Sequence, residues 1–274
     1  MSERVAVRKT YKLFIGGKFP RSESGRSYRV QNSNVAMASR KDVRDAVVAA
    51  RAAFPGWSGA TAYNRGQILY RVAEMLEGRR DQFVALDVPA AEVDESIDRW
   101  VWYAGWADKI AQVYGGANPV AGPYFNLSTP EPTGVVGVVA PAEPALLGLV
   151  SVVAPAIVTG NTVVALASEE RPLAAVTLAE VLATSDLPGG VVNILTGRVA
   201  EMAPWLAGHM DVNAIDLTGV ADPQLATALE EAAAGNLKRV IRPSVGPVDW
   251  MADPGTARMT ALLETKTVWH TKGI

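Results

Sequence analysis

This 274-residue sequence is poor in thiols and imidazoles, two groups that often serve as nucleophiles and metal ligands. The sequence contains no cysteine and two histidines, His209 and His270. The absence of cysteine excludes disulfides, thiolate metal sites and cysteine nucleophiles. Two histidines nearly exclude a histidine zinc site or a serine–histidine–aspartate triad. His209 follows a predicted helix end, where a cation is favourable, so we interpret it as structural and expect no metal site.

One carboxylate stands where ligands bind in sheet proteins. Glu143 follows the predicted strand Val135–Val139, within a turn flanked by Pro141 and Pro144. Ligands of open α/β sheets bind at the carboxyl ends of strands, so an enzyme with new chemistry built on Glu143 is one hypothesis. A solvated loop carboxylate is the commoner explanation for such a residue. An activity that disappears in Glu143→Gln would favour the enzyme.

The elements that would position these side chains differ between the two parts of the chain. Up to Pro132, the pattern predicts a short hairpin at Leu13–Phe19, a helix that begins at a Ser39–Asp42 capping box, further helices around Ile68–Leu76 and Ser96–Val113, and an extended hairpin over Gly116–Pro132. The proline and glycine content of the last hairpin indicates that it leaves the body of the domain.

From Thr133 onward, strands and helices alternate. Strands are expected at Val135–Val139, Thr162–Leu166, Val191–Leu195, Ala214–Leu217 and Arg239–Arg242, and helices at Ala145–Val158, Leu173–Ala183, Ala200–Ala207 and Pro223–Ala234. Short, β-branched, apolar strands alternating with crossover helices indicate a parallel sheet covered on both faces, a Rossmann-like, doubly wound α/β fold. A loop over Pro243–Thr256 follows, and Leu262–Trp269 predicts an isolated edge strand that needs a partner.

Composition excludes several classes of protein. Hydrophobic residues make up 49% and charged residues 20%, as in globular proteins. Lys and Arg total 26 against 28 Asp and Glu, a net charge of −2, which gives no reason to expect nucleic acid or an anionic membrane as a partner. No apolar run reaches the roughly 20 residues that span a bilayer, and no secretory signal is evident. We therefore expect a cytoplasmic protein.

Residues Leu13 to Val240 resemble the N-terminal half of the aldehyde dehydrogenase superfamily. The motifs that carry the resemblance are Phe14–Lys18, Ala52–Trp57, Glu131–Val139, Ala154–Ala156, Gly160–Val164, Leu187–Asn193 and Leu195–Gly197. The tail Glu264–Trp269 is similar to the family's C-terminal strand. The resemblance implies an NAD(P)-binding-type domain in residues 10–117 and 133–247, an oligomerisation arm and tail in residues 118–132 and 258–274, and no catalytic domain between them.

The resemblance also implies where the family's catalytic groups would lie. A cysteine thiolate attacks the aldehyde, a glutamate acts as base and a side-chain amide holds the oxyanion. The resemblance places Pro243 at the position of the base and Glu143 at that of the amide. Proline cannot move a proton, and a carboxylate would repel an oxyanion. We therefore predict a pseudoenzyme with no catalytic residues.

The cofactor positions implied by the resemblance are altered as well. Leu166 replaces the ribose-binding lysine, Val220 replaces a serine of the pyrophosphate turn, and Gln224 replaces a glycine. Asp222 can cap the helix that would otherwise hold phosphate. Family identities persist at Ser168, Glu169, Gly197, Thr218 and Gly219, which we interpret as vestigial cofactor positions kept for turn and sheet geometry. We therefore expect no NAD(P) cofactor.

The features that remain intact concern assembly. In the family, the tail strand extends the sheet of a partner's catalytic domain, which a second copy of this chain could not offer. We therefore predict a non-catalytic subunit that forms a hetero-oligomer with a full-length aldehyde dehydrogenase paralogue and stabilises or regulates it. The alternatives are a free-standing NAD(P)-binding or oxidoreductase-related protein that uses the residual Rossmann domain, and a decay product without function.

Overall fold

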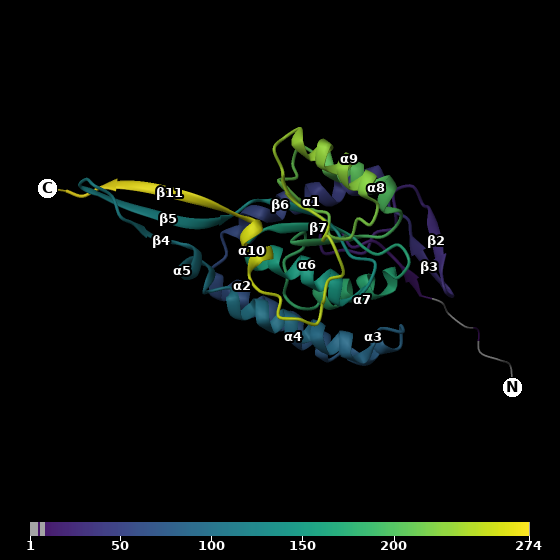
Figure 1. The fold of residues 1–274 in the computed structure, drawn as a ribbon. Helices are drawn as coiled ribbons and strands as arrows, with labels where there is room; N and C mark the ends of the chain where they lie inside the picture. Colours follow the sequence, from purple (N-terminus) through teal and green to yellow (C-terminus); the bar gives the residue numbers. More distant parts are fainter. Residues whose placement is uncertain (1–4, 6–8, 274) are drawn as a thin grey trace.

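The structure is a computed structural model that describes residue 5 and residues 9–273, arranged as a body with a projecting arm (Figure 1). The strands are β1 (Thr10–Tyr11), β2 (Ser27–Val30), β3 (Ser33–Ala36), β4 (Gly116–Asn118), β5 (Tyr124–Pro132), β6 (Val135–Val139), β7 (Thr162–Leu166), β8 (Val192–Leu195), β9 (Ala214–Asp216), β10 (Arg239–Ile241) and β11 (Leu263–Thr271). The helices are α1 (Arg40–Ser58), α2 (Ala62–Glu77), α3 (Arg80–Val84), α4 (Ala90–Trp106), α5 (Ile110–Tyr114), α6 (Leu147–Val158), α7 (Pro172–Leu182), α8 (Val199–Ala207), α9 (Pro223–Ala234) and α10 (Ala257–Ala261).

A five-stranded parallel sheet forms the centre of the body. Its strand order is β10-β9-β6-β7-β8, so the chain winds from the middle strand β6 outward through β7 and β8 and then returns to add β9 and β10 on the other side, as in a doubly wound fold. Every residue of β6, β7, β8 and β9 is buried, which explains why these strands are continuous apolar segments in the sequence. The predicted α/β fold is confirmed, and β6 and β7 have the predicted bounds.

Helices cover both faces of this sheet (Figure 1). Because successive strand residues point to opposite faces, Val136 and Val138 pack with α2, α4, α6 and α7, whereas Val135 and Val139 pack with α1, α8 and α9. The helix α1 begins at the predicted capping box, where the Asp42 carboxylate accepts a hydrogen bond of 2.7 Å from the backbone N–H of Ser39.

The local predictions in the first part of the chain hold in part. The expected hairpin over Leu13–Phe19 is confirmed as a tight turn in which Ile15 and Lys18 exchange backbone hydrogen bonds (2.9 and 3.0 Å), and on the other edge Phe14 exchanges backbone hydrogen bonds with Ile194 of β8 (2.9 and 2.8 Å). The helix expected over Ser96–Val113 is interrupted between Trp106 and Ile110 and divides into α4 and α5. The three-stranded sheet β1-β3-β2 was not predicted.

The projecting arm is a second three-stranded sheet, in the order β11-β5-β4. It contains the extended hairpin predicted for Gly116–Pro132. The tail strand is not isolated, contrary to expectation. One edge of β11 pairs antiparallel with β5 of its own chain, from Leu263 opposite Pro132 to Thr271 opposite Tyr124. Within residues 9–273, the other edge of β11 pairs with no strand.

Asn161 joins the base of the arm to the body. Its buried side-chain oxygen accepts a hydrogen bond of 2.7 Å from the backbone N–H of Gly134, just before β6. Its amide nitrogen donates to the hydroxyl of Thr159 (2.8 Å) and to the carbonyl of Leu262 (2.9 Å), just before β11. One side chain therefore fixes the end of α6, the start of the central sheet and the start of the tail strand.

Replacement of Asn161 by alanine tests this connection. Asn161→Ala leaves the Gly134 N–H and the Leu262 carbonyl buried without these partners, so we expect the free energy of unfolding to fall by about 3 kcal/mol in denaturant titration. The control is Asn64→Ala, which shortens an exposed asparagine of α2 and should change that free energy by less than about 0.5 kcal/mol. Equal effects of the two substitutions would contradict the role of Asn161 in joining the arm to the body.

Candidate functional site

The carboxyl edge of the central sheet is the candidate site. Its strands are parallel, so the loops that follow them meet at one edge, where doubly wound proteins bind ligands. The positions singled out from the sequence are all in these loops or at the strand ends: Glu143 after β6, Leu166 at the end of β7, Ser168 and Glu169 after it, Gly197 after β8, Thr218 and Gly219 after β9, and Pro243 after β10. The hydrogen bonds and packing of each of these residues therefore decide what the site could bind.

A buried ion pair occupies the end of β9. Asp216 has its carboxylate inside the protein, where Arg258 of α10 donates to Oδ2 over 2.8 Å. The backbone N–H of Thr218 donates to Oδ1 over 2.9 Å, and the Thr218 hydroxyl also binds this oxygen. Burial raises the pKa of Asp216, although Arg258 and Thr218 oppose that shift. The N–H and the hydroxyl of Thr218 are thus both hydrogen-bonded within the protein.

The next helix, α9, is closed at its N-terminus by the protein. Asp222 accepts a hydrogen bond of 2.9 Å from the backbone N–H of Gln224, and the first residue, Pro223, has no N–H to offer. The geometry agrees with the capping role predicted for Asp222. Val220 points into the apolar core between the sheet and α8–α9. The helix end that would face a phosphate group is therefore already capped by a carboxylate.

Gly219 is held by close backbone packing. A Cβ atom at this position would lie 2.0 Å from the carbonyl oxygen of Ala140, and the Gly219 N–H donates to the Val139 carbonyl over 2.9 Å. Gly197 has a φ of +135°, and its added Cβ would lie 3.1 Å from the backbone nitrogen of Ala38. Both glycines are required by the path of the chain, whatever else they contact.

The two polar residues after β7 bind neighbouring backbone. Glu169 accepts a hydrogen bond from the N–H of Val199, the first residue of α8, and so caps that helix. Ser168 is buried, and its hydroxyl accepts from the N–H of Arg171 over 3.1 Å. Leu166, at the end of β7, is fully buried in the core. Sequence reasoning missed the capping of α8 because its two partners lie in different loops.

Glu143 lies at the surface. Its carboxylate pairs with the Arg171 guanidinium at 3.0 Å, and another nitrogen of Arg171 donates to the Asp87 carbonyl over 2.7 Å. This is the environment of a solvated salt bridge. Pro243 is half-buried at the beginning of the loop after β10. Pro243 thus has no titratable side chain, and Glu143 has a carboxylate that is paired with Arg171.

A covering segment, residues 243–262, follows β10 and folds back over α6 toward α4 (Figure 1). Arg99, a buried residue of α4, holds this segment by donating to the carbonyls of Trp250 (2.6 Å) and Ala252 (3.2 Å). Arg99 also donates to Ser151 of α6 over 3.1 Å and pairs with a glutamate one turn earlier. The short helix α10 then brings Arg258 to Asp216. The sequence predicted the loop but neither α10 nor these two arginine anchors.

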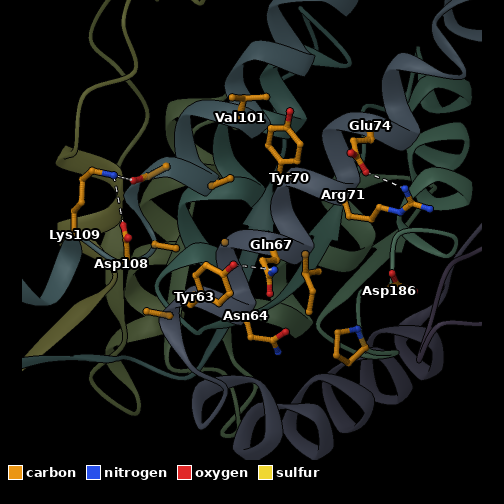
Figure 2. Close-up of a pocket in the computed structure, with 17 residues that line it drawn as sticks. Tyr63, Asn64, Gln67, Tyr70, Arg71, Glu74, Val101, Asp108, Lys109 and Asp186 are labelled. Atoms are coloured by element: carbon orange, nitrogen blue, oxygen red, sulfur yellow. Dashed lines mark hydrogen bonds and ion pairs between the residues drawn. The ribbon is translucent and has the colours of Figure 1, made fainter.

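A large cavity lies elsewhere. It is an open groove of about 1000 Å³ between α2 and α4, and Figure 2 shows Tyr63, Tyr70 and Val101 along it. Each of its cations has an acidic neighbour, because Arg71 pairs with Glu74 at 2.9 Å and Lys109 approaches Asp108 at 3.4 Å, and Asp186 adds a third carboxylate to the lining. None of the residues predicted for the site lines this groove.

The histidine at the end of α8 has a different role from the one predicted. Nδ1 of His209 accepts a hydrogen bond of 3.2 Å from the backbone N–H of Asp211, which requires an unprotonated nitrogen. Burial lowers the pKa of His209. This contact and the lowered pKa disfavour the cation predicted at the helix end, because the sequence did not reveal the partial burial of the ring. Across the described residues, no group of three metal-binding side chains occurs.

No helix within the described part of the chain is both long enough and apolar enough to span a bilayer.

Comparison with known proteins gives consistent matches. The pattern of the aldehyde dehydrogenase family matches residues 28–242. The chain is 34% identical over 250 residues to cytosolic aldehyde dehydrogenase 1 of Elephantulus edwardii, covering 84% of this chain and 49% of that protein. It is also 34% identical over 250 residues to human retinal dehydrogenase 2, covering 84% and 47%. The chain thus spans about half the length of these curated relatives.

Solved structures agree with these matches. The aldehyde dehydrogenase of Bacillus cereus in complex with NAD+ superposes with a TM-score of 0.79 at 26% identity, covering 85% of this chain and 50% of that one. The HpcC protein of Thermus thermophilus superposes with a TM-score of 0.79 at 29% identity, covering 85% and 47%. The family pattern, the relatives and the shared fold together establish that this chain belongs to the aldehyde dehydrogenase family.

Proposed function

We propose that this chain is a non-catalytic family member that works as an assembly subunit for a full-length aldehyde dehydrogenase, which it stabilises or regulates in the cytoplasm. The observation that carries the proposal is a contrast between two parts of the molecule. At the carboxyl edge of the central sheet, the polar groups bind one another, whereas the arm exposes an unpaired strand edge and aromatic side chains.

The case against catalysis rests on the chemistry that the chain can offer. It has no cysteine to form a thiohemiacetal. Of the two positions that the resemblance assigns to the base and the amide, Pro243 has no titratable group, and Glu143 is an exposed partner of Arg171. A base and an oxyanion donor must both point at one reacting centre, and these two residues supply neither.

The case against NAD(P) binding rests on groups that are already engaged. Phosphate binds at a helix N-terminus through free N–H groups and a favourable dipole. Asp222 caps α9 and Glu169 caps α8, so each helix presents a carboxylate where a phosphate would approach. Leu166 is buried and apolar at the position assigned to the ribose-binding lysine. Binding would require the displacement of these internal contacts.

The arm supports assembly because it leaves aromatic side chains and a strand edge exposed. Such a small sheet gains stability when its apolar surface packs against another element. Near the tip, Trp269 is 59% exposed and Phe125 is 44% exposed, and Tyr124 contacts Trp269 edge-on at 5.7 Å between ring centroids. The free edge of β11 offers backbone groups for a further strand. A full-length relative, about twice as long as this chain, has additional surface to cover this arm.

Cofactor binding can be measured directly. We expect no heat in calorimetric titration and no thermal shift with millimolar NAD+ or NADP+, because a ligand that binds the folded state must raise its melting temperature. A full-length family enzyme in the same buffer is the positive control. A saturable signal from this chain would instead favour a free-standing NAD(P)-binding protein.

Assembly can be tested with an arm variant and a matched control. Native mass spectrometry of the chain mixed with a full-length aldehyde dehydrogenase from the same organism should show hetero-oligomers. Trp269→Ser removes an exposed aromatic anchor from the arm and should weaken assembly about tenfold or more. Trp205→Ser removes a comparably exposed tryptophan from α8, where Arg40 stacks on its ring, and should leave assembly unchanged. A lone monomer in every mixture would contradict the proposal, as would equal loss in both variants.

A further inference from the structure

We propose that a cavity on the N-terminal three-stranded sheet binds a small phosphate-bearing anion, either inorganic phosphate or a small phosphate monoester. The cavity has a volume of about 270 Å³ and lies among β1, β2, β3 and the loop between Pro20 and Ser27. Its lining includes three basic residues, Lys12, Arg21 and Arg26, together with hydroxyl and amide side chains from the three strands. This site is separate from the proposed assembly role and does not depend on it.

A buried carboxylate fixes the loop that carries two of these cations. Asp42 of α1 accepts hydrogen bonds of 2.9 Å from the Ser22 hydroxyl and from the backbone N–H of Glu23. The Ser22 carbonyl then accepts from the N–H of Gly25 over 2.9 Å, which closes a turn that Gly25 completes at a φ of +67°. The turn places Arg21 and Arg26 on either side of it. Binding would therefore order little additional backbone.

The positive charge at this cavity is not neutralised by its walls. No acidic residue lines the cavity within the described chain. Lys12 is half-buried, and neither Lys12 nor Arg21 forms an ion pair or side-chain hydrogen bond with another described residue. Arg26 pairs with Glu201 of α8 at 3.2 Å, where both side chains are exposed. Lys12 and the exposed Arg21 thus line the same cavity, and neither has an acidic partner among the described residues.

The nearby carboxylates have other partners. Glu23 accepts from Lys41 over 2.9 Å, and Asp42 is occupied by the loop and by the start of α1. The groove between α2 and α4 differs, because its arginine and lysine each have an acidic neighbour. Guanidinium, ammonium and hydroxyl groups form strong, charge-assisted hydrogen bonds to phosphate oxygens. The cavity is smaller than the usual range for drug-sized ligands, about 300–1,000 Å³, so a phosphate group with a small substituent is the expected size.

Calorimetric titration of the full chain with inorganic phosphate and with glycerol 3-phosphate tests the site. We expect saturable binding of at least one of them, and the relative affinities separate a free ion from a monoester. The double variant Lys12→Gln/Arg21→Gln should weaken binding about tenfold or more, because it removes two charge-assisted contacts. The charge-preserving pair Lys12→Arg/Arg21→Lys should retain binding to within a few-fold.

The matched control removes the same charge from the other cavity. Arg71→Gln/Lys109→Gln alters one guanidinium and one ammonium that line the groove between α2 and α4. Its phosphate affinity should equal that of the unaltered chain, and melting temperatures without ligand show whether each variant is folded. The proposal is overturned if the chain gives no heat and no thermal shift at millimolar phosphate or monoester. It is also overturned if Lys12→Gln/Arg21→Gln and Arg71→Gln/Lys109→Gln lose phosphate affinity equally, which would indicate non-specific attraction of anions.

Discussion

Asp216 ends β9, an interior strand of the central sheet, with its carboxylate enclosed by protein. A buried charge without a partner costs about 3–5 kcal/mol, so the fold must supply a cation there. Arg258 supplies it from α10, far along the chain, and Thr218 contributes its N–H and hydroxyl. The covering segment must therefore return to the sheet edge before the tail strand begins. This ion pair links the edge of the sheet to the base of the arm.

The covering segment explains why the carboxyl edge of the central sheet is closed, whereas the arm has a free strand edge. Arg99 holds it against α4 and α6, and Asn161 holds the residue before β11 at the base of the arm. Internal contacts therefore satisfy the polar groups at the sheet edge, and a nucleotide would have to displace them. The arm, in contrast, leaves the body with a free strand edge. This contrast between the sheet edge and the arm is what supports the proposed assembly role.

The sequence allowed those parts of the fold to be predicted whose signals are local. Strands buried on both faces are continuous apolar segments, so β6 and β7 could be located to the residue, and Asp222 lies beside the helix that it caps. Long-range partners have no such signal. The pairing of β11 with β5, the capping of α8 by Glu169 and the contact of Arg258 with Asp216 join residues far apart in the sequence. His209 was misjudged for a related reason, because its burial depends on the loops around it.

Hydrogen–deuterium exchange of the full chain, measured alone, with NAD+ and with a full-length aldehyde dehydrogenase, tests the central claim most directly. If the sheet edge is closed and the arm is the working surface, the enzyme should slow exchange in residues 124–132 and 263–271. NAD+ should leave the exchange rates of residues 166–171 and 217–225 unchanged. Protection of those two loops by NAD+, with no protection of the arm by the enzyme, would contradict the account.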